Sequence, residues 1–369
     1  MFNSYLKKTI SDLNSTLGLL KERINNLENE NNRIHAILNS MVEGVIAVDK
    51  DTRVLSLNPT AKSIFNIAAN NALGKIFLEV FPNNDIAEVI AQVLKKGEFI
   101  SKELTLIWPV QKVFQVNASP IIESGAVNGC LLVIHDITEI RRLETMRRDF
   151  VANVSHELKT PLTSIKGFVE TLLEGAMEDK ENSINFLKII NNHADRLNTL
   201  INDLLDLSHI ESKEIALKKE KFVLARLVDE VMLGFKSQAK KKAVELRSEL
   251  PKDLEVFADK SKLEQVFTNL INNAIKYNKD QGFVRVYAEQ SASQIKITVE
   301  DSGSGIPARD IPRIFERFYR VDKARSRELG GTGLGLSIVK HIIELHSGLV
   351  GVQSTEGLGS KFFFTIPVF

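Results

Sequence analysis

This sequence of 369 residues is poor in cysteine, in long apolar runs and in net charge. Its one cysteine, Cys130, cannot form a disulfide within the chain, which fits a reducing compartment such as the cytoplasm. No apolar run approaches the roughly 18 residues that a membrane span needs, and the N-terminus lacks the apolar core of a signal peptide. We therefore expect a soluble, cytoplasmic chain. A longer parent protein, anchored in the inner membrane by segments upstream, stays open.

Charge is almost balanced, with 48 basic and 47 acidic residues and a formal net charge of +1. Nucleic-acid-binding proteins carry a basic surface that neutralises phosphates, so we expect no nucleic-acid partner. The chain also exceeds the length at which a single hydrophobic core stops growing. Two or more domains are therefore expected, with the function located in particular sites.

The N-terminal segment carries a heptad pattern, in which apolar residues advance by alternating steps of four and three. Asn31 falls at an a position, where a buried amide can fix the register of a two-stranded coil. The pattern predicts a parallel coiled coil over residues 1–34. The alternative is one amphipathic helix packed on its own domain, which the narrow stripe and its polar flanks disfavour. The seam consists of Leu6, Ile10, Leu13, Leu17, Leu20, Ile24, Leu27, Ile34, Leu38 and Met41.

Residues 35–137 change to short apolar runs separated by turn residues, which is typical of strands. Helical stretches lie between these runs. An α+β module of about 100 residues fits this pattern. The predicted strands are Val45–Val48, Val54–Leu57, Val113–Val116 and Leu131–Ile134.

Residues 138–218 predict a helical hairpin. The first helical pattern runs from Thr138 to Gly175, and the second begins near Ser183. The second helix carries an apolar stripe with steps of three and four, so two hairpins would close a dimeric four-helix bundle. That stripe is Leu187, Ile190, Ala194, Leu197, Ile201 and Leu204. From 219 to 369 strand and helix patterns alternate again, as in an α/β domain. The predicted fold class is multidomain α+β.

The first hairpin helix contains a histidine in a distinctive setting. His156 and Thr160 lie four residues apart and share one helix face, with Glu157 beside the histidine. Pro161 cannot donate a helical hydrogen bond, so the helix should bend there. With an unperturbed pKa near 6.5, His156 can present a neutral, nucleophilic ring nitrogen, and Glu157 could take the other ring proton.

This stretch resembles the phosphoacceptor box of sensor histidine kinases, whose pattern His-Glu-x-x-Thr-Pro is matched by His156, Glu157, Thr160 and Pro161. The resemblance implies that His156 is the phosphorylated residue. It also implies that Thr160 helps to orient the water that hydrolyses the acyl phosphate of a response regulator.

The last domain contains a polar helix face and two glycine clusters. On the predicted helix 260–277, an amide oxygen of Asn273 suits Mg²⁺ and Lys276 adds positive charge for phosphates. An ordinary exposed polar face explains this helix alone equally well. A half-buried strand then delivers Asp301-Ser-Gly-Ser-Gly305, where a buried carboxylate could accept a hydrogen bond from the amine of adenine. The cluster from Gly330 to Gly335 opens a helix whose N-terminus suits phosphate oxygens.

Four segments resemble, in this order, the N, G1, F and G2 boxes of the histidine-kinase ATP domain: Asn269–Tyr277, Asp301–Gly305, the F segment Ile314–Arg320 and Gly331–Leu336. The likeness to the family runs from Arg148 to the end. The resemblance implies an α/β sandwich of the Bergerat type that binds ATP and Mg²⁺, with Asn273 on the metal and Asp301 on adenine. Residues 306–330 would form a lid whose arginines, Arg313, Arg317, Arg320, Arg325 and Arg327, include one that meets the γ-phosphate. The expected nucleotide-binding residues are Asn269, Asn273, Lys276, Tyr277, Asp301, Gly303, Gly305, Arg317, Gly331, Thr332, Gly333, Leu334, Gly335, Leu336 and Thr365.

The module at residues 35–137 resembles a PAS sensor domain in Asn58, in its alternating strands and in Asp136-Ile137-Thr138 at its end. The whole pattern implies a homodimeric sensor histidine kinase. It would phosphorylate His156 from Mg-ATP, transfer the phosphoryl group to an aspartate of a response-regulator receiver domain, and dephosphorylate that regulator. The ligand of the PAS-like module stays unknown, as does whether one subunit phosphorylates itself or its twin.

Two other functions compete with this one. The first is a catalytically silent dimeric scaffold, which the intact boxes disfavour. The second is an ATP-hydrolysing machine on the same nucleotide fold. There the resemblance implies a glutamate four residues before the metal asparagine, but Asn269 stands in that place and cannot accept a proton.

Overall fold

The computed structural model describes residues 2–67, 72–106, 111–211, 217–322 and 331–368, with side chains from residue 16 onward apart from that of Glu211. It divides into two compact units, Met1–Arg147 and Arg148–Phe369. Among the described helices, none combines the length and the apolar character needed to cross a membrane.

The first unit begins with one long helix, α1 (Phe2–Ser40). The helix predicted for residues 1–34 is therefore present and continues to Ser40. Its seam residues Leu17, Leu20, Ile24 and Leu27 are between 49% and 57% exposed. This single chain thus leaves the heptad stripe available to a partner helix, and its pairing stays a prediction.

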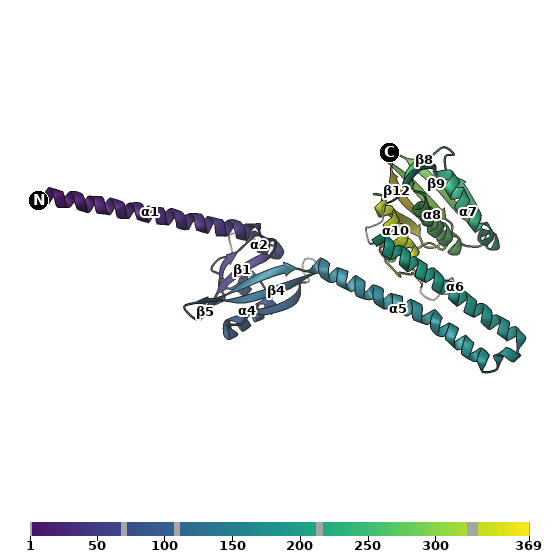
Figure 1. The fold of residues 1–369 in the computed structure, drawn as a ribbon, viewed down its shortest axis with the longest axis horizontal. Coiled ribbons are helices and arrows are strands. Elements are labelled where there is room, and N and C mark those ends of the chain that lie inside the picture. The colour runs from purple at the N-terminus through teal and green to yellow at the C-terminus, as the bar shows by residue number, and fades with distance from the viewer. Residues whose placement is uncertain (1, 68–71, 107–110, 212–216, 323–330, 369) are drawn as a thin grey trace. The chain divides into compact units, whose positions relative to one another are not determined.

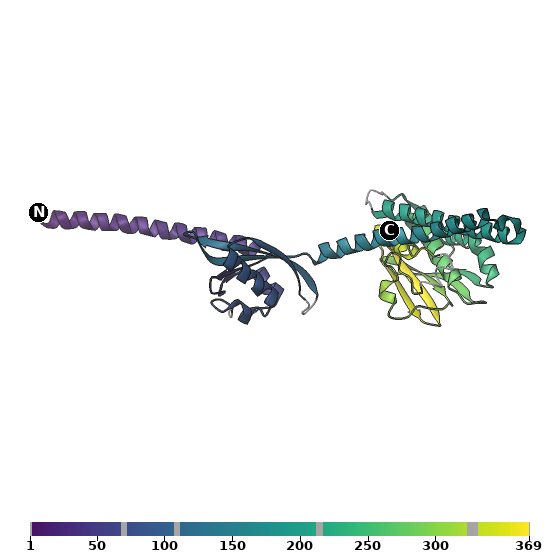
Figure 2. The ribbon, with the colours of Figure 1, turned by 90° about the horizontal axis from the view of Figure 1, so that it is seen from below.

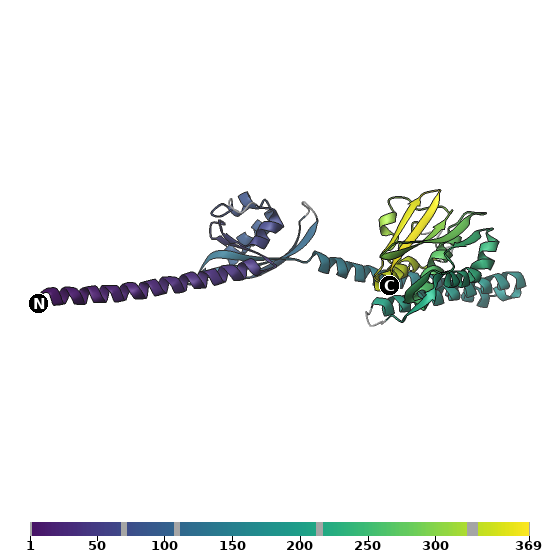
Figure 3. The ribbon, with the colours of Figure 1, turned by 90° about the horizontal axis from the view of Figure 1, so that it is seen from above.

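The rest of the first unit is an antiparallel five-stranded sheet in the order β2-β1-β5-β4-β3. Helices α2, α3 and α4 cover one face of this sheet (Figures 1–3). All four predicted strands are confirmed, and Phe77, Phe81 and Phe114 belong to the apolar core between sheet and helices. The elements are β1 (Gly44–Asp49), β2 (Val54–Leu57), α2 (Pro59–Phe65), α3 (Phe77–Val80), α4 (Asn84–Lys96), β3 (Ile100–Leu106), β4 (Lys112–Glu123) and β5 (Ala126–Asp136).

Asn58 joins the end of α1 to this sheet. Its side-chain oxygen accepts the N–H groups of Val45 and Ala61, each at 2.9 Å, and so caps α2. Its amide nitrogen donates to the carbonyls of Leu38 and Glu43 at 3.1 and 2.8 Å. All the hydrogen-bonding capacity of one buried amide thus holds the connection between helix and sheet.

The second unit contains the predicted hairpin. Helix α5 (Thr138–Leu173) starts in the first unit and continues on both sides of Pro161, and a short 3₁₀ turn (Ala176–Glu178) leads to α6 (Lys180–Glu211). Phe168 and Phe186 pack across the hairpin with ring centroids 5.4 Å apart. The C-terminal half of α6 lies against the following domain, where Leu200, Leu207 and Ile210 belong to its core.

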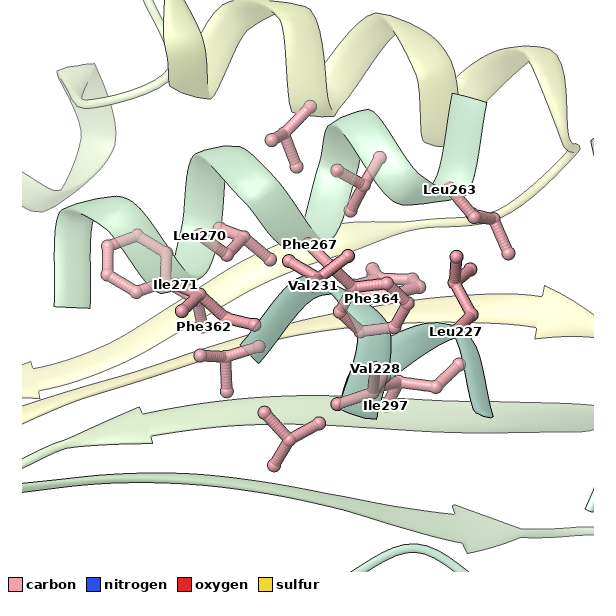
Figure 4. Packing of buried hydrophobic residues seen from close by; sticks show 14 of the residues in the cluster. Leu227, Val228, Val231, Leu263, Phe267, Leu270, Ile271, Ile297, Phe362 and Phe364 are labelled. Carbon is pink, nitrogen blue, oxygen red and sulfur yellow. The ribbon is translucent and has the colours of Figure 1, made fainter. Parts of the chain in front are cut away.

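The C-terminal domain is an α/β sandwich, as predicted. A five-stranded sheet in the order β11-β12-β10-β9-β7 is covered on one face by α7, α8 and α10, and β6 pairs with β8 beside it. Phe267 of α8 meets Phe364 of β12 edge to face at 5.6 Å, among Leu227 and Val228 of α7 (Figure 4). The elements are β6 (Lys219–Val223), α7 (Leu224–Lys241), β7 (Glu245–Glu249), β8 (Glu255–Asp259), α8 (Lys260–Lys276), β9 (Phe283–Gln290), β10 (Gln294–Asp301), a 3₁₀ turn (Ile311–Arg313), α10 (Gly335–Leu345), β11 (Val350–Thr355) and β12 (Gly359–Pro367).

Candidate active site

Helix α8 places its polar residues on a cavity. Asp259 caps the helix by accepting the N–H of Lys262 at 3.1 Å, and the apolar side chains of Leu263, Phe267 and Leu270 are buried. The opposite face turns toward a cavity of about 660 Å³, a size typical of small-ligand sites. The predicted residues that line it are Asn269, Asn273, Lys276, Tyr277, Asp301, Gly305, Gly331, Thr332, Gly333, Gly335 and Leu336. Residues from 260 to 336 therefore converge on one site.

Asp301 stands at the end of β10, where burial raises the pKa of its carboxyl to about 6. The N–H groups of Gly303 and Ser360 act in the opposite direction, and the Gly303 N–H donates to Oδ1 at 2.8 Å. A side chain at position 303 would put its Cβ 2.4 Å from the carbonyl oxygen of Tyr277, so the turn requires glycine there. The carboxylate is therefore fixed in a buried position that suits a polar donor from a ligand.

The second glycine cluster packs against the F segment. Gly333 has a left-handed φ of 76°, and its carbonyl accepts the N–H of Phe318 at 2.8 Å. A Cβ at Gly333 would lie 2.9 Å from the backbone of Phe318, so only glycine permits this approach. The cluster leads directly into α10, whose N-terminal amides face an anion favourably.

Lys276 supplies a cation whose proton is held less firmly than usual. Burial, together with the neighbouring positive charges of Arg320, Arg196 and Lys242, lowers its pKa to about 8. A bound phosphate would relieve this crowding of positive charge and favour the protonated amine. The electrostatics of this corner therefore suit an anionic ligand.

On α5 the side chain of His156 is exposed, but its two predicted helpers are engaged elsewhere. The Thr160 hydroxyl donates to the carbonyl of His156 at 3.0 Å. Oε2 of Glu157 accepts from Arg196 of α6 and from Arg320 of the F segment, both at 3.0 Å. In this arrangement Glu157 therefore links three segments of the unit.

Four predicted residues do not line the cavity. Thr365 is buried, and its hydroxyl accepts the N–H of Leu349 at 2.9 Å. Arg317 lies over the ring of Phe150 at 5.3 Å. Gly303 donates its N–H to Asp301 at 2.8 Å, and Leu334 is buried in the apolar core. Arg325 and Arg327 lie outside the described residues.

The cavity also has walls that the motifs did not indicate. Thr199 and Asp203 reach it from α6, and Phe362 lies on another side. Arg320, one of the expected lid arginines, also lines the cavity. The spacing of Thr199 and Asp203 places both on one helix face, which was the only signal in the sequence. Assigning that face to the nucleotide cavity requires knowing how the hairpin docks.

The residues of the cavity fit a hard cation that is mostly ligated by substrate. The described residues contain no group of three or more His, Cys, Asp or Glu side chains that could hold a metal alone. Mg²⁺ keeps several waters and takes phosphate oxygens, so a single amide oxygen from Asn273 at the cavity wall is a sufficient protein ligand.

Known protein families match consecutive parts of the chain. The PAS fold matches residues 38–142, the His Kinase A (phospho-acceptor) domain 146–213, and the histidine kinase-, DNA gyrase B- and HSP90-like ATPase 258–369. A sensor protein kinase WalK of Staphylococcus aureus is 35% identical over 98% of this chain and 88% of its own length. The chain belongs to the sensor histidine kinases.

Other relatives of this sensor histidine kinase are longer. WalK of Bacillus subtilis (strain 168) is 37% identical over 92% of the chain and 56% of its own length, and WalK of S. aureus (strain Newman) is 35% identical over 98% and 60%. The chain thus spans between 56% and 60% of these two proteins. Among solved structures, histidine kinase ThkA in complex with the response regulator protein TrrA matches 90% of this chain and 97% of its own, with a TM-score of 0.50 and 27% identity.

Proposed function

We propose that this protein phosphorylates its own His156 from Mg-ATP and passes the phosphoryl group to an aspartate of a response regulator. The observation that carries the proposal is the exposed His156 on a helix whose next residue, Glu157, is bound to Arg320 of the nucleotide cavity wall. One compact unit thus contains both a candidate acceptor and a candidate donor site.

Each side chain has a specific task in this reaction. Asp301 accepts the adenine amine, and Asn273 holds the Mg²⁺ that neutralises charge between the phosphates. Lys276 offers a proton-bearing amine to the same phosphates. A neutral ring nitrogen of His156 attacks the γ-phosphorus, the bond from that phosphorus to the bridging oxygen breaks so that ADP leaves, and a nearby base takes the other ring proton. Within the described residues both of its hydrogen bonds, from Arg196 and Arg320, use Oε2, so Oε1 of Glu157 is the oxygen that can take this proton.

We infer the partners of this protein from its exposed apolar side chains and from its relatives. The His Kinase A match implies dimerisation, and the hairpin exposes the apolar side chains Leu162, Ile184, Leu187, Ile201 and Leu205. We propose a homodimer that buries these side chains in a four-helix bundle. ThkA was solved with a response regulator, which supports a receiver domain as the acceptor. Because ATP is available in the cytoplasm, we propose that the reaction takes place there. We also propose that the PAS domain receives the signal that controls the kinase.

Incubation with γ-labelled ATP tests the function directly. We expect label on the protein, none on a His156→Ala variant, and transfer of label to a receiver domain. Release of free phosphate without labelled protein would indicate an ATP-hydrolysing machine, and no loss of ATP at all would indicate a scaffold. Because Asn269 cannot activate water as a carboxylate does, we expect direct hydrolysis to be slow.

A further inference from the structure

Helix α6 contributes an acidic wall to the nucleotide cavity. The docked half of the helix is fixed by Leu200 and Leu207, which are 3% and 1% exposed in the core of the ATP-binding domain. Asp203, three residues after Leu200 and four before Leu207, lies on the same side of the helix and lines the cavity. A carboxylate at this place is unexpected, since the same cavity must accept the phosphates of ATP.

Asp203 is tied to the glycine loop. Its Oδ2 accepts the hydroxyl of Thr332 at 2.7 Å, and Thr332 is 8% exposed. Burial raises the pKa of Asp203, the bond from Thr332 lowers it, and the charge of Asp206 raises it. The carboxylate is therefore held where its charge is poorly solvated, and the loop beside the N-terminus of α10 is held with it.

Two physical consequences follow for a nucleotide. Phosphates at the N-terminus of α10 would approach a negative charge in a partly desolvated cavity, which weakens their binding. The Thr332 hydroxyl is also directed to α6 and is not free for a ligand. We propose that Asp203 sets the nucleotide affinity of this site, because its charge opposes the phosphates and its hydrogen bond holds the glycine loop against α6. This inference rests on the proposed function of the cavity.

The coupling must be reciprocal. If the bond between Asp203 and Thr332 disfavours nucleotide, then bound nucleotide disfavours that bond by the same factor. ATP would in this way loosen the hairpin from the ATP-binding domain, which frees the domain to move relative to His156. The effect should increase with the number of phosphates and vanish for adenosine.

The test compares nucleotide affinities by calorimetry in the full chain with Mg²⁺, in a His156→Ala background so that no transfer consumes ATP. Asp203→Ala should bind ATP about five- to tenfold more tightly, in the lower range of allosteric couplings, ADP less so, and adenosine equally. Asp203→Asn loses the charge but can still accept from Thr332, so it should give a smaller gain. If Asp203→Ala folds poorly, Asp203→Asn still tests the inference.

Asp206→Ala is the matched control. Asp206 also links α6 to the ATP-binding domain, accepting from Gln265 at 2.6 Å, but it does not line the cavity. Its loss should leave ATP affinity unchanged. An equal gain in Asp206→Ala, or unchanged or weaker ATP binding in both Asp203 variants, would overturn the inference while leaving the proposed function intact. A parent protein that binds no ATP would overturn both.

Discussion

At the scale of single residues, a substitution of Asn273 tests the candidate site most directly. The amide of Asn273 lies at the cavity wall on α8, next to buried Ala274 and three residues before half-buried Lys276. Asn273→Asp replaces a neutral amide oxygen by a carboxylate. Its negative charge would face the phosphates and would change how the metal is held. We expect at least a hundredfold loss of autophosphorylation, roughly the cost of a misplaced catalytic group, with an unchanged thermal midpoint. Full labelling of a folded Asn273→Asp protein would rule out the metal role.

Thr160 tests a different activity. We expect Thr160→Ala to keep most autophosphorylation but to leave a phosphorylated regulator long-lived when kinase and ADP are added. The hydroxyl is too weak a base to help His156 lose its proton, but it shares the helix face of His156, where we propose that a regulator docks. In the structure the Thr160 hydroxyl donates to the His156 carbonyl. If this local hydrogen bond is its main role, Thr160→Ala should lower both activities together. Measuring both reactions on one purified variant distinguishes these outcomes.

His346 should make folding of the ATP-binding domain sensitive to acid. The ring is 1% exposed; Nδ1 donates to the Ile342 carbonyl at 2.8 Å, and Nε2 accepts the N–H of Asp259 at 3.1 Å. Burial lowers its pKa below the usual value. Below about pH 6.5 the unfolded chain therefore binds a proton that the folded ring resists, so stability falls with pH until the folded pKa is reached.

We expect the thermal midpoint to decrease between pH 7 and pH 5 by more in the parent than in His346→Gln, which has no titrating ring. Asp301 works in the opposite sense, since its raised pKa adds stability as pH falls below about 6, so the comparison must be between variants. His193→Gln, on the half-exposed surface of α6, provides a control that keeps the parent's pH profile. Identical profiles for all three proteins would exclude the ring as the cause.

At the scale of elements, α6 carries two apolar stripes with separate partners. Leu200, Leu207 and Ile210 are buried against the ATP-binding domain, whereas Ile201 and Leu205 are 45% and 53% exposed. The predicted bundle stripe contains Ile201 but also Leu204, which packs against the ATP-binding core. The heptad pattern therefore did not separate the docking stripe from the exposed one. Periodicity gives the faces of a helix, and only the tertiary arrangement assigns each face to a neighbour.

Because the hairpin keeps its own exposed stripe, α1 should not be the sole source of dimerisation. Removing residues 1–34 should weaken the dimer only in part, with a shift of the dissociation constant and no clean monomer. Sedimentation equilibrium over a range of concentrations measures this shift. A control that replaces Asn31 by Leu should strengthen association through α1, since a buried amide costs stability. A pure monomer after truncation would assign dimerisation to α1 alone.

At the scale of the whole molecule, the sequence predicted the fold class and most of the residues that line the cavity. The resemblance to the boxes of the histidine-kinase ATP domain, carried by the polar face of α8 and the glycine clusters, named eleven lining residues. The contacts between the hairpin and the ATP-binding domain were not predictable. Asp203 and Thr332 are 129 residues apart and Glu157 and Arg320 are 163 apart, and no local pattern encodes such pairs.

The link through Glu157 makes the docking of these two parts testable. Arg320 has a side chain only 6% exposed, and among the described residues its Nε has no hydrogen-bond partner. Glu157→Gln would leave two buried or half-buried guanidinium groups without their counter-charge, which typically costs about 3–5 kcal/mol for a buried pair. We expect the hairpin to undock rather than the domain to unfold, since the core around Phe267 is independent of Glu157.

Hydrogen exchange measures this outcome. In Glu157→Gln, amides of residues 314–320 and of the docked half of α6 should exchange faster, while those in the middle of α8 keep the parent's rate. Glu170→Gln is the matched control on the same helix, because Glu170 pairs only with exposed Lys166 at 3.6 Å and such surface pairs contribute little. Autophosphorylation should fall as well if Glu157 is the base for His156. Slower labelling with an unchanged exchange pattern would mean that the carboxylate acts on the histidine and does not hold the two parts together.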